Sequence, residues 1–429
     1  MVKRYSYFIL ILLAKQTAFC QSIDKVINAK EVERIERTLS ADGMRGRKIF
    51  SPEIDKAADF IASEFKKAGL QPVNGNTYLQ EFVMLRTKVV MAGGKMNGRV
   101  LDEKSVAAIT AKETLTVTQA SGYKQVIVHG TDTLNVLVSR LQKSGGDYLL
   151  MVDTAHRKWF DVYRRGMQNQ FAPKGNIVMV LASEEAGEYS IEYRQTVTSM
   201  PLKNVVGILP GKSKKNEYVI FSGHYDHLGV GRANEAGDSI YNGANDDAAG
   251  TTAVMMLAHY FAKLKNNERT IIFAAFTGEE SGGYGSRYFS QQFSPDQVMA
   301  MFNIEMIGTE SKWGTNSAFI TGYEKTDMGT ILEKNLEGTN FKFYPDPYPT
   351  QQLFYRSDNA TLARLGVPAH TISTSKMDSE KYYHTQEDEI ETLDMNNMAA
   401  IIKAIAISST SIVAGKDTPS RVTEDALKR

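Results

Sequence analysis

Hydrophobic positions near the start of the chain recur with the period of an α-helix. Residues 23–39 carry one such pattern, and residues 52–68 carry a second in which apolar side chains recur every three to four positions. The second pattern also has end signals: Ser51 as the N-cap, Pro52 as the first helical residue and Gly69 as the C-terminal stop. Two consecutive helices are therefore predicted before the first strand.

From residue 204 to about residue 415, short apolar runs alternate with helical patterns. The predicted strands are residues 205–209, 218–222, 270–276, 299–304 and 367–372. The longest helical patterns are residues 248–264 and 393–413. Such alternation is typical of a mostly parallel sheet with helices on both faces. We therefore predict an α/β fold with three αβα layers around a mixed, mostly parallel sheet.

The middle of the chain has a different pattern. Strand-like runs occupy residues 89–92, 114–118, 125–128, 148–152 and 176–181, with helical stretches between them. We predict that residues 86–199 form a smaller mixed α/β domain, inserted into a discontinuous main domain of residues 21–85 and 200–415. Residues 416–429 are polar and are predicted to form a loose tail.

Basic residues precede an apolar stretch at the N-terminus. Lys3 and Arg4 are followed by residues 5–14, a stretch much shorter than the ~20 apolar residues of a membrane span. Ala at −3 and Cys at −1 then suit signal peptidase cleavage after Cys20. We therefore predict that residues 1–20 are a signal peptide and that the protein is exported to the periplasm or outside the cell. No later apolar segment approaches membrane length, so no membrane span is expected in the mature chain.

Composition narrows the classes of partner and of metal site. With 429 residues, of which 42% are hydrophobic, the chain can bury a large core and more than one domain. The formal net charge of +1 gives no reason to expect nucleic acid as a partner. Cys20 is the only cysteine, so a chain cleaved after it has no disulfide, and any metal site must use His, Asp and Glu ligands.

Imidazole and carboxylate side chains gather in five short motifs in the second half of the chain. The motifs are Gly223-His224-Tyr225-Asp226, Asn245-Asp246-Asp247, Thr277-Gly278-Glu279-Glu280, Asn303-Ile304-Glu305-Met306 and Tyr383-His384-Thr385. Most follow or end a predicted strand, and open α/β sheets bind ligands at strand ends. Zinc takes imidazole and carboxylate ligands, and two zinc ions ~3.5–4 Å apart need a bridging ligand. The five motifs together therefore predict a two-zinc hydrolytic centre.

Individual side chains suggest roles within such a centre. The adjacent carboxylates of Glu279 and Glu280 point in different directions, so one can bind metal while the other acts as a base toward water. Asp226 follows His224 closely and can accept the second imidazole N–H to orient that ring. Each motif alone has an ordinary structural explanation, such as helix capping by Asp246. Their order, spacing and strand-end placement favour the joint interpretation.

The same stretches resemble the secreted co-catalytic zinc exopeptidases, a family that includes bacterial leucyl aminopeptidases, aminopeptidase Y and glutamate carboxypeptidase. The resemblance extends along residues 242–250 and to residues 42–70 and 356–368. It covers nearly all of the predicted main domain. The predicted insert lies where relatives carry a protease-associated domain.

The resemblance implies a role for each site residue. Asp246 would bridge two zinc ions, Glu279 would be the general base, and Tyr383 would donate a hydrogen bond to the tetrahedral oxyanion. The other implied ligands are Glu280 and His384 for one zinc ion and His224 and Glu305 for the second. The resemblance also implies a cis peptide between Asp246 and Asp247.

Two positions depart from the residues that relatives usually carry. Glu305 stands where most have Asp, and Asn359 stands where many have His. Glu305 is still a competent zinc ligand, but its extra methylene leaves open which end of a peptide is recognised. The remaining histidines of the predicted main domain, His227, His259 and His370, are expected to be structural rather than zinc ligands.

These inferences predict an exported zinc-dependent exopeptidase that acts on peptide substrates, with an aminopeptidase preferred to a carboxypeptidase. The alternatives are a glutaminyl cyclase of the same fold, which uses one zinc ion, and a receptor-like binding protein without catalysis. Cyclases lack the Asn-Asp-Asp-Ala-Ala-Gly pattern, and receptor-like relatives usually lose ligands that this chain retains. The specificity pocket is expected to involve the loops at residues 312–316 and 341–352.

Overall fold

The computed structural model describes residues 23–427 and divides them into two compact units. The main unit comprises the described residues up to Glu81 and from Lys203 onward, and the inserted unit comprises Phe82–Leu202. The boundaries predicted from the sequence fall inside two long strands, β2 (Leu79–Met96) and β10 (Tyr189–Leu209), which continue from one unit into the other. The predicted signal peptide lies outside the described residues.

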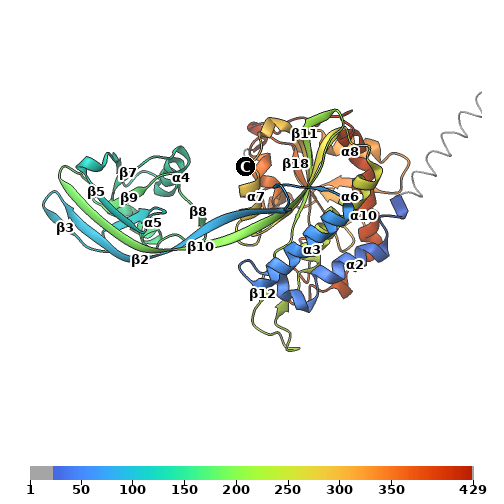
Figure 1. Ribbon diagram of the computed structural model, residues 1–429, viewed down its shortest axis with the longest axis horizontal. Helices are drawn as coiled ribbons and strands as arrows, with labels where there is room; N and C mark the ends of the chain where they lie inside the picture. The colour runs from blue at the N-terminus through green and yellow to red at the C-terminus, as the bar shows by residue number, and fades with distance from the viewer. Residues whose placement is uncertain (1–22, 428–429) are drawn as a thin grey trace, which may run out of the picture. The chain divides into compact units, whose positions relative to one another are not determined.

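The main unit is built on a mixed, mostly parallel sheet (Figure 1). In spatial order its strands are β17 (Lys342–Pro345), β16 (Ser317–Ile320), β18 (Ala369–Ser373), β15 (Val298–Ile304), β11 (Lys214–His224), β14 (Arg269–Phe276) and β10. The central strands β18, β15, β11 and β14 pair in parallel. Toward the edges, β10 pairs antiparallel to β14, and β16 pairs antiparallel to β18. The predicted α/β class is confirmed.

Helices cover both faces of this sheet. One face packs against α2 (Ala29–Leu39), α3 (Pro52–Ala68), α6 (Ala249–Leu264) and α10 (Met395–Ser408). The opposite face packs against α7 (Tyr284–Phe289) and α9 (Asn359–Ala363). Successive strand residues point to opposite faces, so Val219 and Phe221 of β11 belong to the first core and Ile220 to the second. The main unit therefore has the three predicted αβα layers.

The end signals of the second predicted helix are confirmed in α3. The Ser51 side chain accepts a hydrogen bond from the N–H of Ile54, and Pro52 is the first helical residue. Gly69 ends the helix in the left-handed conformation, with φ 81°. Among residues 23–427, no helix combines the length and the apolar character that a membrane crossing requires.

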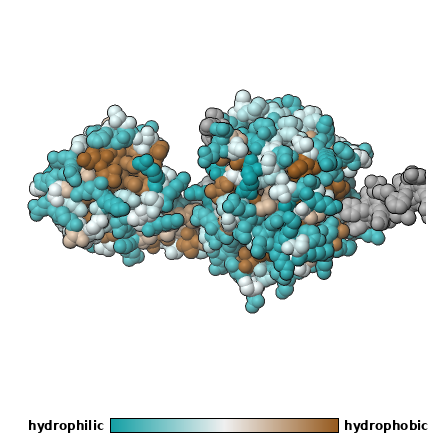
Figure 2. Space-filling model, turned by 90° about the horizontal axis from the view of Figure 1, so that it is seen from above, coloured by the Kyte–Doolittle hydropathy of each residue, from teal (hydrophilic) through white to brown (hydrophobic). Residues whose placement is uncertain are grey.

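The inserted unit contains a second sheet with its own core. Its strand order is β4 (Val106–Ile109), β9 (Ile177–Leu181), β7 (Tyr148–Val152) and β6 (Lys124–Val128). The helices α4 (Leu134–Ser144) and α5 (Arg157–Arg164) belong to the same unit. Figure 2 shows an apolar area on the surface of this unit, and its exposed large apolar side chains include Val136, Trp159 and Val162. None of the five motifs lies in this unit.

The C-terminal residues are packed, which differs from the predicted loose tail. The fully buried guanidinium of Arg269 donates to the backbone oxygen of Asp417 at 2.7 Å. Arg421 donates to the backbone oxygen of Val298 at 2.7 Å, and Val422 is buried. A polar composition does not reveal such contacts, because their acceptors are backbone carbonyls in distant parts of the chain.

A buried carboxyl on α2 should make the stability of the main unit depend on pH. Glu36 is fully buried and accepts a hydrogen bond from Thr252 at 2.8 Å, and its burial raises its pKa from the ordinary 4.5 to about 8. The pKa of Glu36 is higher in the folded chain than in the unfolded chain, so its protonated form favours folding. This contribution to the unfolding free energy is complete below about pH 4.5. It decreases by ~1.4 kcal/mol per pH unit as the pH rises to about 8.

Glu36→Gln is expected to remove this part of the pH dependence. The difference in unfolding free energy between the variant and the wild type should therefore move in favour of the variant from pH 5 to pH 8. Urea denaturation with a chelator present, at a series of pH values, measures this difference. Parallel stability curves for the two proteins would contradict the expectation.

Candidate metal centre

The predicted motifs meet at the C-terminal ends of the central strands. His224 is the last residue of β11, Glu280 follows β14 and Glu305 directly follows β15. Asp246 lies in the turn before α6, and His384 lies in the loop between β18 and α10. Parallel strands end at the same edge of a sheet, so segments that are far apart in sequence bring their side chains to one place.

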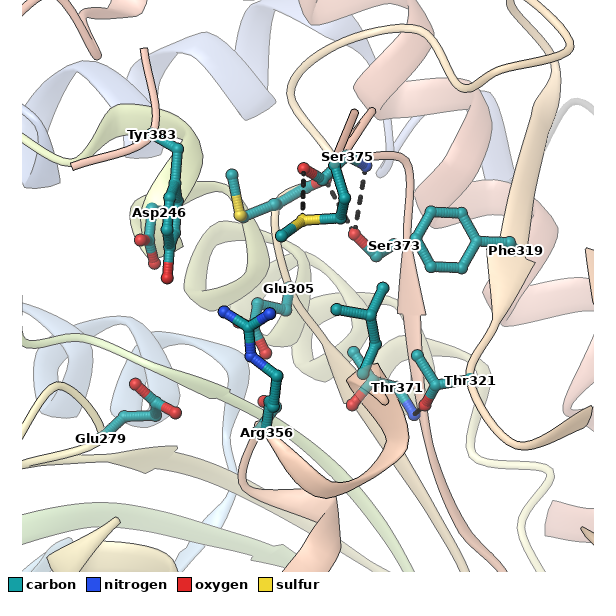
Figure 3. A pocket seen from close by; sticks show the side chains of 14 residues that line it. Asp246, Glu279, Glu305, Phe319, Thr321, Arg356, Thr371, Ser373, Ser375 and Tyr383 are labelled. Carbon is teal, nitrogen blue, oxygen red and sulfur yellow. Dashed lines mark hydrogen bonds between the residues drawn. The ribbon is translucent and has the colours of Figure 1, made fainter. Parts of the chain in front are cut away.

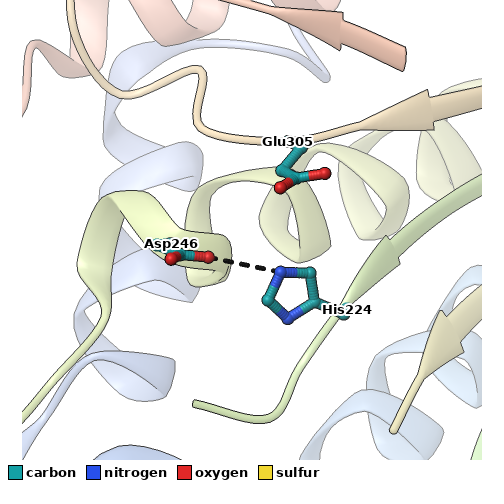
Figure 4. A group of neighbouring side chains, drawn as sticks. All are labelled: His224, Asp246 and Glu305. Atoms are coloured by element: carbon teal, nitrogen blue, oxygen red, sulfur yellow. Dashed lines mark ion pairs between the residues drawn. The ribbon is translucent and has the colours of Figure 1, made fainter. Parts of the chain in front are cut away.

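One potential ligand group consists of His224, Asp246 and Glu305 (Figure 4). Their potential ligand atoms all lie within 4.8 Å of one another. The imidazole Nε2 of His224 is 3.2 Å from Asp246 Oδ1. All three side chains are buried or nearly so, which shields a bound cation from bulk water.

A second potential ligand group lies on the other side of Asp246. The Nε2 atom of His384 is 3.3 Å from Asp246 Oδ2 and 3.2 Å from Glu280 Oε2. Asp246 therefore presents Oδ1 to one group and Oδ2 to the other. This is the arrangement that a carboxylate bridging two cations requires.

Several buried polar atoms at this centre have no hydrogen-bond partner within residues 23–427, as is expected of atoms that bind a metal ion. Among the described residues, His224 Nε2, Glu305 Oε2 and His384 Nε2 are buried and have no hydrogen-bond partner. Buried polar atoms are normally paired, so lone pairs left in this way are suited to a cation. Imidazole nitrogens together with carboxylate oxygens form a donor set that suits zinc.

Burial and charge shift the pKa values of these groups strongly. Burial alone raises the pKa of Asp246, but the imidazoles of His224 and His384 outweigh this effect and hold it well below its ordinary value. The carboxylates of Asp246 and Glu280 raise the pKa of His384 to about 10. Burial and the charge of Asp246 raise the pKa of Glu305 to about 7. The centre is thus rich in negative charge, which favours a divalent cation.

Asp226 takes a position that differs from the prediction. The Nδ1 atom of His224 is 3.1 Å from the backbone oxygen of Asp226, whereas the carboxylate Oδ1 is 3.8 Å away. That carboxylate oxygen instead accepts the backbone N–H of Glu279 at 3.1 Å. The turn after His224 orients the ring through its backbone, and the Asp226 side chain holds the loop that carries Glu279.

Two carboxylates outside the predicted set hold the backbone of the ligand loops. Asp247 accepts the backbone N–H groups of His224 and Met306, each at 3.1 Å, and so links the ends of β11 and β15. Asp388 accepts the backbone N–H of Asp246 at 3.0 Å. The peptide between Asp246 and Asp247 is cis, as the resemblance implied.

A buried arginine links the same loops from the N-terminal part of the chain. Arg47 is fully buried and donates to four backbone oxygens, those of Leu39, Tyr225, Asn242 and Gly243, at 2.6–2.9 Å. It therefore joins the turn after His224 to the turn before Asp246. No sequence pattern marks this role, because every acceptor is a backbone carbonyl.

His227 also lies at the centre, although a structural role away from the ligands is expected from its sequence context. Its Nδ1 atom is 2.8 Å from Glu280 Oε1, and with Asp246 these residues form a second set of potential ligands within 4.8 Å. The sequence signal for this position is a second imidazole directly after the Gly223-His224-Tyr225-Asp226 motif. His259 and His370 instead form hydrogen bonds away from the centre, as expected of structural histidines.

A pocket of about 540 Å³, including its open mouth, adjoins the centre (Figure 3). Glu279, Glu305 and Tyr383 line it on the side of the metal centre. The rest of its lining includes the apolar Met306, Phe319, Leu353 and Met377, the hydroxyl residues Thr321, Thr371, Ser373 and Ser375, and Arg356. These residues lie outside the loops at 312–316 and 341–352, which were expected to contribute to the specificity pocket.

Tyr383 has the features of a hydrogen-bond donor to a substrate. Its ring stacks on that of His384, with centroids 3.9 Å apart and planes inclined by 20°. Burial holds the pKa of Tyr383 well above its ordinary value, so the hydroxyl keeps its proton. The side chain lines the pocket close to Asp246 (Figure 3).

Part of the main unit is similar in sequence to a known protein family. Residues 204–408, which include every predicted site residue, match Peptidase family M28. A probable zinc metalloprotease of Pyrenophora teres f. teres (strain 0-1) is 34% identical over 140 residues, which are 30% of this chain and 28% of the relative. A probable leucine aminopeptidase of Trichophyton verrucosum (strain HKI 0517) is 25% identical over 229 residues, 50% of this chain and 58% of the relative. The matches thus span between 28% and 58% of these relatives.

Solved structures share the fold at low sequence identity. An aminopeptidase from Aneurinibacillus sp. strain AM-1 has a TM-score of 0.53 and 17% identity, covering 94% of this chain and 97% of its own. A zinc aminopeptidase from Bacillus subtilis has a TM-score of 0.53 and 16% identity, covering 93% of this chain and 99% of its own. These structures support the fold class, and the sequence match relates residues 204–408 to a peptidase family. Residues 204–408, just under half of the chain, are thus similar to Peptidase family M28.

Proposed function

We propose that this protein is an exported aminopeptidase that uses two zinc ions to remove N-terminal residues from peptides. One observation carries the proposal: the two oxygens of Asp246 face two separate groups of imidazole and carboxylate ligands. The names of the relatives, a probable zinc metalloprotease and a probable leucine aminopeptidase, agree with this chemistry.

The proposed ligand assignment follows the two groups around Asp246. His224 and Glu305 would hold one zinc ion, Glu280 and His384 would hold the other, and Asp246 would bridge them. Bound zinc lowers the pKa of water toward neutrality and polarises a carbonyl. Glu305 stands where the resemblance implies an aspartate, and its proximity to His224 and Asp246 supports a ligand role for the longer side chain.

The proton transfers are assigned to residues that line the pocket. Glu279 is placed beside the ligand groups without belonging to either, so it can take a proton from the attacking water and pass it to the departing amine. Tyr383 donates a hydrogen bond to the carbonyl oxygen as negative charge develops there. The substrate's first side chain would occupy the pocket, whose walls combine apolar side chains with hydroxyl groups and Arg356.

Mass spectrometry of a peptide pool, half of it N-acetylated, tests the proposal with the zinc-loaded full chain. Loss of residues from free N-termini only is the expected result. Trimming of C-termini in both halves would identify a carboxypeptidase, and loss of ammonia from N-terminal Gln would identify a cyclase. An unchanged pool would overturn the enzymatic proposal in favour of a binding protein.

His384→Ala is expected to lower zinc content by about one ion per chain, because one ligand group loses its imidazole. Hydrolysis of free N-termini should fall with it, since the bridged pair of ions is incomplete. Elemental analysis after dialysis gives the zinc content. His129→Ala, which changes an exposed histidine of the inserted unit, is the control and should bind zinc as the wild type does. Full zinc content in His384→Ala would refute its role as a ligand.

We also propose that residues 1–20 are removed on export and that the inserted unit, Phe82–Leu202, is a separate domain. The basic and apolar pattern of the first residues and the separate core of the inserted unit support these two points. N-terminal sequencing of the mature protein tests the first: a sequence beginning at Gln21 is expected, and an intact Met1 would contradict it.

A further inference from the structure

His227 is buried beside the Glu280 half of the metal centre, the ligand group formed by Asp246, Glu280 and His384. Its side chain is fully buried, and its backbone N–H donates to the backbone oxygen of Arg47 at 3.4 Å. The ring packs against Gly243 so closely that a Cβ atom there would lie 2.5 Å from ring carbons. A side chain at position 243 would displace the imidazole, so the glycine makes room for it.

The polar contact of this ring is not an ordinary hydrogen bond. The Nδ1 atom lies 2.8 Å from Glu280 Oε1, yet neither atom has a hydrogen-bond partner among the described residues. The Nε2 atoms of His224 and His384 share this property at 3.2–3.3 Å from carboxylate oxygens. All three imidazoles therefore lie close to carboxylates without directing an N–H at one oxygen, as metal ligands do.

The separations between atoms fit a shared cation. With zinc–ligand bonds of ~2.0–2.2 Å, two ligand atoms at angles above 90° lie ~2.8–4.3 Å apart. His227 Nδ1 is 2.8 Å from Glu280 Oε1 and 3.9 Å from Asp246 Oδ2. His384 Nε2, already assigned to this half, is 3.2–3.3 Å from oxygens of the same two carboxylates. The rings of His227 and His384 are 5.7 Å apart between centroids.

We propose that His227 is a further ligand of the metal at the Glu280 half, through Nδ1. This inference rests on the proposed two-zinc function. The Glu280 half then has four protein residues, His227, Asp246, Glu280 and His384, whereas the other half has three. The two ions are consequently unequal: the Glu280 half binds first and more tightly, and the other half exchanges its ion more readily.

Two variants of the full chain test whether His227 binds the metal or only donates a hydrogen bond to Glu280. In His227→Asn the amide nitrogen occupies the position of Nδ1 and keeps the donor, but an amide is a poor zinc ligand. His227→Leu fills similar space and removes both functions. Zinc affinity is measured by competition with a chelator, and X-ray absorption counts imidazoles per zinc. Circular dichroism of the chelated proteins checks that each variant folds.

The ligand role predicts ~1.5 imidazoles per zinc in the wild type, because three histidines serve two ions, and ~1 in both variants. Both variants should lose about 100-fold or more in affinity for the tighter ion, since losing partners outside the ligand set already costs 10–100-fold. One imidazole per zinc in the wild type, or full affinity in His227→Asn, would overturn the inference and make His227 a hydrogen-bond donor to Glu280.

The wild type also serves as the test of the underlying function. A protein that binds two zinc ions with only His224 and His384 as imidazole ligands would contradict the role of His227 alone. A wild type that takes up no zinc would contradict the proposed function itself.

Discussion

Glu279→Ala is expected to retain both zinc ions and to lose turnover by about a thousandfold, within the 10²–10⁴ range of general acid–base catalysis. Glu279 lines the pocket but belongs to neither ligand group, so its removal leaves the ligands in place. Burial raises the pKa of Glu279 well above its ordinary value. A raised pKa suits a carboxylate that must accept a proton from water and then return it to the leaving amine.

Zinc content and kcat of Glu279→Ala, measured on the same preparation, check this expectation. Glu279→Gln keeps the shape of the side chain without a basic oxygen and should fail to the same degree. Glu324→Ala, at an exposed glutamate, serves as the control and should leave kcat unchanged. Turnover close to that of the wild type in Glu279→Ala would refute the assignment of the general base.

Asp246→Ala is expected to lose both zinc ions and all measurable peptidase activity. Its two oxygens face the two ligand groups, with Oδ1 3.2 Å from His224 Nε2 and Oδ2 3.3 Å from His384 Nε2. Without this bridge, two dications at short separation would repel each other with no shared anion between them. The effect should therefore exceed that of His384→Ala, which removes one ligand from one group.

Elemental analysis and calorimetric zinc titration measure the loss in Asp246→Ala. Asp59→Ala, an exposed aspartate on α3, is the matched control and should bind zinc as the wild type does. Because the backbone N–H of Asp246 also donates to the Asp388 carboxylate in a buried turn, the variant's fold is checked by circular dichroism. Retention of two tightly bound ions by a folded Asp246→Ala would show that another residue bridges them.

The fold class follows from local patterns in the sequence. The alternating apolar runs predicted β11, β14, β15 and β18, because strands buried on both faces are continuously apolar. The caps of α3 were predictable because capping depends on neighbouring residues only. The edge strands β16 and β17 were missed because four-residue runs do not show a reliable period.

The sequence by itself also predicted which residues would carry the chemistry, because the types and order of His224, Asp246, Glu280, Glu305 and His384 are typical of a zinc site. Tertiary structure decided the contacts among them. It directed the two oxygens of Asp246 to different groups and brought His227 to Glu280. In the folded chain the backbone oxygen of Asp226 orients the His224 ring, and Arg47 holds the turn before Asp246. These contacts depend on where backbone carbonyls and ring nitrogens lie in space, which no period or spacing along the chain encodes.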